Sequence, residues 1–208
     1  MIHIISNGLM IALFVYLTIF ACHILIRNQN VESDLRYYFY GIAAYFVFFI
    51  VSQSIFMVNS MAFKEETLTY QVLYILGNFL GHIGLLLLMY VVEKHIYDKL
   101  RYIPTIIILL SAILELIFFE YMFLFIVLLL VTATLIPIIY IGVAIRTTGK
   151  TKIKGILNGV GLIIFMLGIL FNTYFMLSLS VAFYFLGPIM EFLGVAIFHY
   201  ALLFYGRS

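Results

Sequence analysis

The chain has 208 residues, of which 66% are hydrophobic and only 10% carry a charged side chain, and its mean hydropathy is +1.21. A water-soluble domain of this length needs far more charge on its surface, so the composition excludes that class and predicts an all-α integral membrane protein. A net charge of +2 creates no field that would attract nucleic acid, and the single cysteine excludes an intramolecular disulfide.

Seven apolar segments are candidates for membrane-spanning helices, which need about 20 mostly apolar residues. In chain order they are 4–26, 36–58, 70–92, 103–118, 122–145, 155–178 and 182–205. The run from 103 to 145 is too long for one span, so we place a tight turn near Glu120. Pro104 suits a helix start and Pro137 a kink. We expect the first segment to be a retained helix, because it is longer than a signal-peptide core and follows no basic stretch.

The distribution of lysine and arginine predicts the orientation of these seven helices. If the N-terminus lies outside, the inner joints and the C-terminus hold ten of the 11 basic residues and the outer joints hold one. Basic residues are enriched on the cytoplasmic side of membrane proteins. We therefore expect one domain, residues 1–208, that crosses the cell membrane several times with its N-terminus outside and its C-terminus inside.

Glu191 lies near the middle of the last apolar segment, three residues after Pro188. An ionisable group at membrane depth is costly and is a functional candidate for that reason. The proline removes a backbone donor, which favours a kink beside the carboxylate. Glu191 is either a ligand- or proton-binding group that lines a cavity, or a structural acid that joins two helices by a hydrogen bond.

Other polar residues fall at a comparable depth on the second, third and sixth segments. They are Gln53, Asn78, His82 and Asn172. If they face one another and Glu191, they form a small polar pocket in the outer half of the bundle. The alternative is a set of scattered hydrogen bonds between helices, without a pocket. We expect Glu115 and Glu120 to lie at the outer interface, and a role in the site is the alternative.

Two histidines give a haem alternative. His23 and His199 lie at a similar depth near the inner side, on the first and last segments, and two imidazoles can hold a haem iron axially. The competing interpretation is that each is a hydrogen-bonded bundle residue. The sequence contains no zinc-binding motif and no nucleophile–base pair, so we expect no enzyme activity, no metal site and no resident cofactor.

Glycines four residues apart occur twice, as Gly77 and Gly81 and as Gly155 and Gly159. This spacing allows two helix backbones to approach closely in lipid. We expect it to serve packing inside one bundle, and dimerisation through the same spacing is the alternative.

The stretches "LGHIGLLLLMYVVEKHIY" (80–97) and "LGPIMEFLGVAIFHYALLFY" (186–205) resemble segments of small archaeal seven-helix membrane proteins. In length and layout the chain is similar to the seven-helix sensor regions that precede histidine kinases. The resemblance implies a ligand-sensing membrane module. Because the chain carries no output domain, signalling would require a separate partner.

The function that we expect is therefore that of a receptor-like membrane protein. It would bind a small ligand in the polar layer of Gln53, Asn78, His82, Asn172 and Glu191 and signal through its basic inner loops. One alternative is a small proton-coupled transporter or channel that uses Glu191. Another is a membrane subunit of a larger complex, with or without haem. The expected partners are membrane lipid and a cytoplasmic or membrane protein, with no nucleic acid, and an oligomer is possible.

Overall fold

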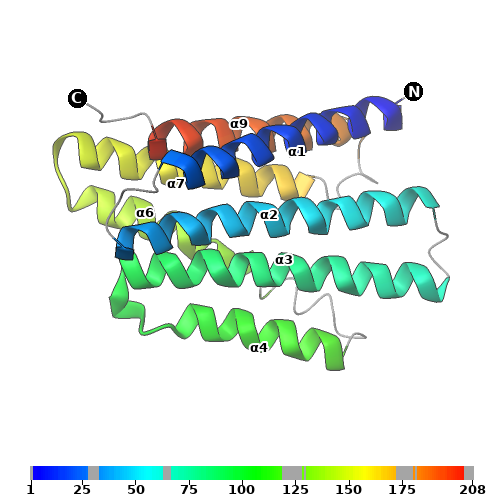
Figure 1. Ribbon diagram of the computed structural model, residues 1–208, viewed down its shortest axis with the longest axis horizontal. Helices are drawn as coiled ribbons and strands as arrows, with labels where there is room; N and C mark the ends of the chain where they lie inside the picture. The colour runs from blue at the N-terminus through cyan, green and yellow to red at the C-terminus, as the bar shows by residue number, and fades with distance from the viewer. Residues whose placement is uncertain are drawn as a thin grey trace. The chain divides into compact units, whose positions relative to one another are not determined.

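The computed structural model describes residues 2–27, 33–62, 67–118, 128, 130–171, 180 and 182–203, and these residues form helices and turns without a strand (Figure 1). In chain order the elements are α1 (Ile2–Arg27), α2 (Ser33–Ala62), α3 (Leu68–His95), the short 3-10 helix η1 (Asp98–Leu100), α4 (Ile103–Ile117), α6 (Leu135–Ile145), α7 (Gly149–Phe171) and α9 (Phe183–Leu203). The predicted all-α class is confirmed for this part of the chain.

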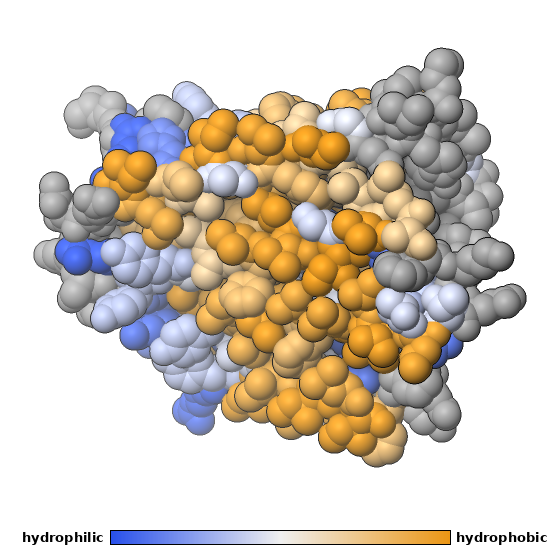
Figure 2. Space-filling view, turned by 45° about the vertical axis from the view of Figure 1, so that its right-hand side comes forward, coloured by the Kyte–Doolittle hydropathy of each residue, from blue (hydrophilic) through white to orange (hydrophobic). Residues whose placement is uncertain are grey.

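Five of these helices are long and apolar enough to cross a membrane: α1, α2, α3, α7 and α9. Two shorter apolar helices, Ile103–Ile117 and Leu130–Ile145, fall where we predict the fourth and fifth spans. The visible surface of the helices in Figure 2 is mainly hydrophobic, and large apolar side chains such as Ile117 and Ile138 are exposed. Such a surface requires lipid or protein around it. The turn predicted near Glu120 lies outside the described residues.

The chain divides into two compact units, and their boundaries fall inside α1, after Ile19, and after Ala133. We call residues 20–133 the α2–α4 unit and the remainder the α6–α9 unit. In the α2–α4 unit, α3 packs antiparallel against both α2 and α4. The side chain of Asn59 donates to the Tyr70 carbonyl at one end of the α2–α3 pair, over 3.0 Å, and the rings of Tyr38 and His95 meet at the other end.

Glycines bring α2 and α3 close together. A Cβ atom on Gly84 would lie 2.9 Å from the Cβ of Phe48 and 3.3 Å from the carbonyl oxygen of Tyr45. A Cβ atom on Gly77 would meet the Phe56 ring at 2.7 Å. His82 lies about 100° around the helix from Gly81, whose position faces Ser52 of α2, so its side chain leaves α3 on another side.

In the α6–α9 unit, α7 packs against α6 and α9. Gly155 and Gly159 face α6, where an added Cβ would meet Ala144 at 2.7 Å or Ile141 at 2.4 Å. The two predicted glycine pairs therefore serve packing between neighbouring helices of one unit. Gly149, the first residue of α7, has a φ of +62°, a left-handed conformation that suits glycine where the chain turns from α6 into α7.

Two helix starts differ by more than three residues from those predicted. The helix α7 begins at Gly149, six residues before the predicted apolar segment, because lysines can extend a helix while their charged ends reach the interface. In the predicted fifth segment, the helix is interrupted by a turn at Thr134 before α6 begins. Thr134 precedes Pro137 by three residues, and a proline cannot donate the hydrogen bond that would continue the helix there.

Candidate functional site

His82 lies in the middle of α3, and its side chain is fully buried. Its Nδ1 atom is 2.9 Å from the backbone carbonyl oxygen of Asn78, one turn earlier. A carbonyl oxygen only accepts hydrogen bonds, so Nδ1 carries a proton and donates it. This contact fixes the tautomer of the neutral ring, in which Nε2 is the proton-accepting atom.

Glu115 of α4 is the partner of this histidine. Its Oε2 atom lies 3.1 Å from Nδ1 of His82, and the two side chains are each 0% exposed. We predict Glu115 at the outer interface from the sequence, and that prediction is wrong. The carboxylate is on the one face of α4 that packs against α3, together with Pro104, Ile108, Ser111 and Ala112. A buried carboxylate needs a counter-charge or a proton, and His82 supplies either.

The pair has three buried atoms without a hydrogen-bond partner within the described part of the chain. They are Nε2 of His82 and both carboxyl oxygens of Glu115, of which Oε2 approaches Nδ1 without a hydrogen bond. Beyond the proton on Nδ1, the pair can hold a second proton on the imidazole or on the carboxyl group. With that proton the pair is neutral overall, and without it the pair carries one negative charge.

The other charged side chains and histidine of α2, α3 and α4 lie far from this pair. Among the described side chains they are Arg36 on α2 and Glu93, Lys94 and His95 on α3. Glu93 is eleven residues from His82, which corresponds to about 16 Å along a helix. Within the described residues no group of three His, Cys, Asp or Glu side chains could hold a metal ion. Among the described charged side chains of α2, α3 and α4, Glu115 is therefore the one in contact with His82.

The remaining members of the predicted polar layer have separate environments. The Asn78 side chain donates to the Tyr74 carbonyl over 3.0 Å, so this residue reaches His82 through its backbone. Gln53 is half-buried on α2, beside Ser52, whose hydroxyl donates to the Gly77 carbonyl over 2.7 Å. Asn172 lies outside the described residues.

Glu191 is also buried, with a side chain that is 1% exposed. It belongs to α9 in the α6–α9 unit, where a Cβ atom on Gly168 of α7 would lie 2.6 Å from its Cγ and its backbone nitrogen. Pro188 is inside the same helix, as the sequence predicts. Because His82 belongs to the other unit, a pocket that joins the two residues stays a prediction.

The two histidines of the haem alternative have protein partners. Nδ1 of His199 is 2.8 Å from the hydroxyl of Tyr16 on α1. Nε2 of His23 is 3.4 Å from Nη1 of Arg27, and since a guanidinium only donates, this nitrogen accepts. Iron ligation by that atom would require Arg27 to move away.

Comparison with known proteins adds no further assignment. No protein-family model, no curated protein and no solved structure matches the chain. The function must therefore be argued from the residues themselves.

From the sequence, a site role for Glu115 is only the alternative to an interfacial position, although the position of Glu115 around the helix favours that role. Ser111 and Ala112 precede it by four and three residues, so the three lie on one face of the helix. Around this face, positions such as Ile113, Leu116 and Ile117 are apolar and exposed. A single carboxylate on the face of α4 that carries small residues indicates contact with a neighbouring helix.

Proposed function

We propose that this protein is a receptor-like integral membrane protein that senses protons through the His82–Glu115 pair. It would cross the cell membrane seven times, with its N-terminus outside and its C-terminus inside. Five long apolar helices and two shorter ones support the number of spans, and the ten-to-one distribution of basic residues supports the orientation.

The complete burial of His82 and Glu115 supports a proton as the stimulus. A proton needs no cavity, whereas a small molecule must displace protein atoms or enter an existing pocket. Adding a proton to the neutral pair gives it one positive charge, and removing one gives it one negative charge. Either change places a net charge in a low-polarity environment, where it is strongly disfavoured.

The helix α4 is the element that would respond. Its buried face packs on α3, and its exposed side chains are apolar. Lipid on the exposed face is fluid and would allow α4 to move relative to α3. A net charge on the pair weakens the contact between Glu115 and His82 and favours a state in which water reaches one of them. The resulting displacement of α4 is the signal that a separate protein partner would read.

The ligand-sensing version of this function remains a broader form of the same proposal. It adds Gln53, Asn78, Asn172 and Glu191 as contacts for a small molecule. It rests on the similar depth of these residues within the predicted membrane-spanning segments. The resemblance to the sensor regions of histidine kinases supports the same class of function.

The proposal is tested by measuring how the distance between α3 and α4 depends on pH. In a Cys22→Ser background, Leu76→Cys and Leu116→Cys introduce two sites for spin labels at side chains that are 43% and 50% exposed. We expect the label distance to change with pH in this protein. It should stay constant in a control that also carries His82→Gln and Glu115→Gln, since neither amide titrates. The same pH response in both proteins would refute the proposal.

A second candidate function, proton-coupled transport, is favoured by the burial of Glu191 against the glycine surface of α7. Carboxylates at membrane depth carry protons in many pumps and transporters. Protein reconstituted in liposomes with a pH gradient would then conduct protons, and Glu191→Gln would abolish that flux. A sensor without transport activity gives no flux in either case.

A further inference from the structure

A cluster of three tyrosines and a lysine lies at the end of the α2–α4 unit where α3 ends. The Nζ atom of Lys94 is 5.7 Å from the ring centroid of Tyr37 and 6.0 Å from that of Tyr90. The ring of Tyr102 stacks on that of Tyr90, with a centroid distance of 5.7 Å and an interplanar angle of 24°. The four residues, which we call the Lys94 cluster, come from α2, α3 and the start of α4. The aromatic faces hold the ammonium group by cation–π interactions.

The backbone before α4 is strained in a way that places Tyr102 in this cluster. Arg101 has a φ of 52° and Tyr102 a φ of 62°, so two successive residues other than glycine adopt the left-handed conformation. This conformation is unfavourable for residues with a Cβ atom. The Arg101 N–H donates to the Asp98 carbonyl, and Thr105 donates its N–H and its hydroxyl to the Glu93 carboxylate. These bonds hold the strained turn, and the turn presents the tyrosine ring.

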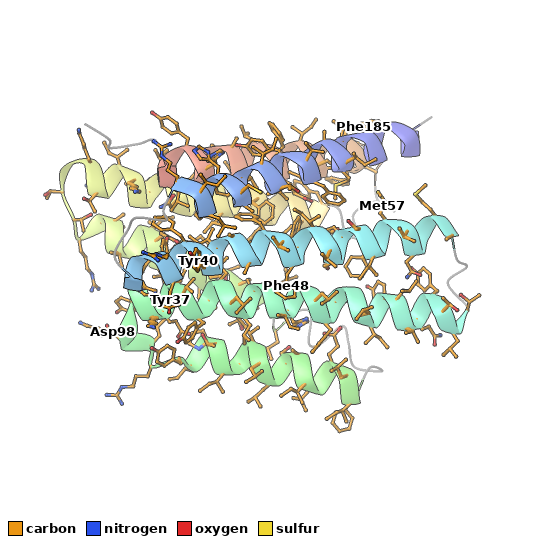
Figure 3. All side chains as sticks on the ribbon, viewed as in Figure 1. Tyr37, Tyr40, Phe48, Met57, Asp98 and Phe185 are labelled. Carbon is orange, nitrogen blue, oxygen red and sulfur yellow. The ribbon has the colours of Figure 1, made fainter. Side chains whose placement is uncertain are left out.

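The Lys94 cluster is exposed and positively charged. Tyr37 is 59% exposed, and Tyr90 and Tyr102 are each 41% exposed. Lys99 and Arg101 in the adjoining turn are exposed as well. Asp98 is an exposed carboxylate in this turn, and Figure 3 shows it at the same end of the helices as Tyr37. The Glu93 carboxylate is buried and directed at Thr105, so it does not cancel the charge at the surface.

We propose that the Lys94 cluster binds the phosphate group of an anionic membrane phospholipid. Tyrosine and lysine at the end of apolar helices lie at the level of the lipid headgroups, where an aromatic ring has one apolar and one hydrated side. The ammonium of Lys94 and the tyrosine hydroxyls are donors, Arg101 adds a positive charge in the adjoining turn, and a phosphate offers strong acceptors and the opposite charge. A lipid supplies, in addition, acyl chains that match the exposed apolar side chain of Ile103 beside the cluster. This site does not depend on the proton-sensing proposal.

The test measures the thermal stability of the detergent-solubilised protein while phosphatidylglycerol is added. We expect a saturable rise in the melting temperature that phosphatidylcholine does not produce. Lys94→Ala should raise the phosphatidylglycerol concentration needed for half of this effect by about fivefold, since one basic residue near an anionic surface contributes on the order of 1 kcal/mol. Lys94→Arg keeps the positive charge and should show the same half-saturating concentration as the wild-type protein.

Lys152→Ala is the matched control, because it removes one exposed lysine from the first turn of α7 in the other unit. We expect it to leave the half-saturating concentration nearly unchanged. Equal loss in Lys94→Ala and Lys152→Ala would mean that net charge alone attracts the lipid, and the proposal would be wrong. An equal rise with phosphatidylcholine, or with inorganic phosphate in place of lipid, would also overturn it.

Discussion

Nδ1 of His82 lies 3.1 Å from Oε2 of Glu115, and both side chains are fully buried. Removing one partner leaves the other buried without its counterpart. We expect His82→Leu and Glu115→Leu each to lower the free energy of unfolding by about 3 kcal/mol. The measurement is unfolding of the protein in mixed micelles, followed by circular dichroism.

The double variant His82→Leu/Glu115→Leu distinguishes a specific pair from general damage to packing. An apolar pair of similar volume avoids the cost of burying charge, so its stability should lie close to that of the wild-type protein. If the two losses simply add in the double variant, the contact between the side chains is not what stabilises the α3–α4 interface.

A second polar contact joins α3 and α4 near the start of α4. The Glu93 carboxylate accepts the N–H of Thr105 over 3.1 Å and its hydroxyl hydrogen, at the positive end of the α4 dipole. We expect Glu93→Ala to lower the free energy of unfolding by about 1–2 kcal/mol, because the first turn of α4 loses its acceptor. Glu93→Gln keeps an acceptor and should cost less. Equal effects of both changes would contradict this account, because they would mean that a neutral acceptor at position 93 contributes nothing.

The helices α7 and α9 approach closely at Gly168, where an added Cβ would lie 2.6 Å from the backbone nitrogen of Glu191. Backbone atoms cannot move away as a flexible side chain does. We expect Gly168→Ala to lower stability by about 2–3 kcal/mol. Gly142→Ala is the control, because no atom lies within 4 Å of its added Cβ. It should be neutral or stabilise by up to about 1 kcal/mol. Tolerance of alanine at position 168 would contradict the packing of Glu191 on α7.

The left-handed backbone at Arg101 predicts an unusual gain from glycine. We expect Arg101→Gly to raise the free energy of unfolding by about 1 kcal/mol, since glycine adopts a φ of 52° without a steric penalty. Lys99→Gly removes the same charge from η1, two residues earlier, and should instead lower stability slightly. Destabilisation by both substitutions to the same extent would show that the turn is not strained.

The positions of the helices could be predicted from the sequence, because the mean hydropathy of a segment of about 20 residues depends only on the residues of that segment. The start of α7 could not, since a hydropathy window excludes Lys150, Lys152 and Lys154 although the helix includes them. A charged side chain at a helix end can reach the interface, so polarity alone does not end a helix.

The candidate site was less predictable, because it depends on which faces of the helices meet. Depth along the helix was enough to mark His82 and Glu191 as costly and therefore notable. Depth does not say which neighbour each residue faces, and the buried partner of His82 is Glu115, on the following helix. The exposed apolar residues of α4 indicate this contact only when the position of Glu115 around the helix, on the opposite face, is taken into account.

The most direct test of the central proposal is nitrogen NMR of His82 in protein with ¹⁵N-labelled histidine, compared with the His82→Gln variant to assign the signal. From about pH 4 to about pH 9, we expect Nδ1 to stay protonated and Nε2 to gain a proton at low pH, with a midpoint that Glu115→Gln shifts. Nitrogen shifts of His82 that do not change over this range, or a change that is the same in Glu115→Gln, would contradict proton sensing by the pair.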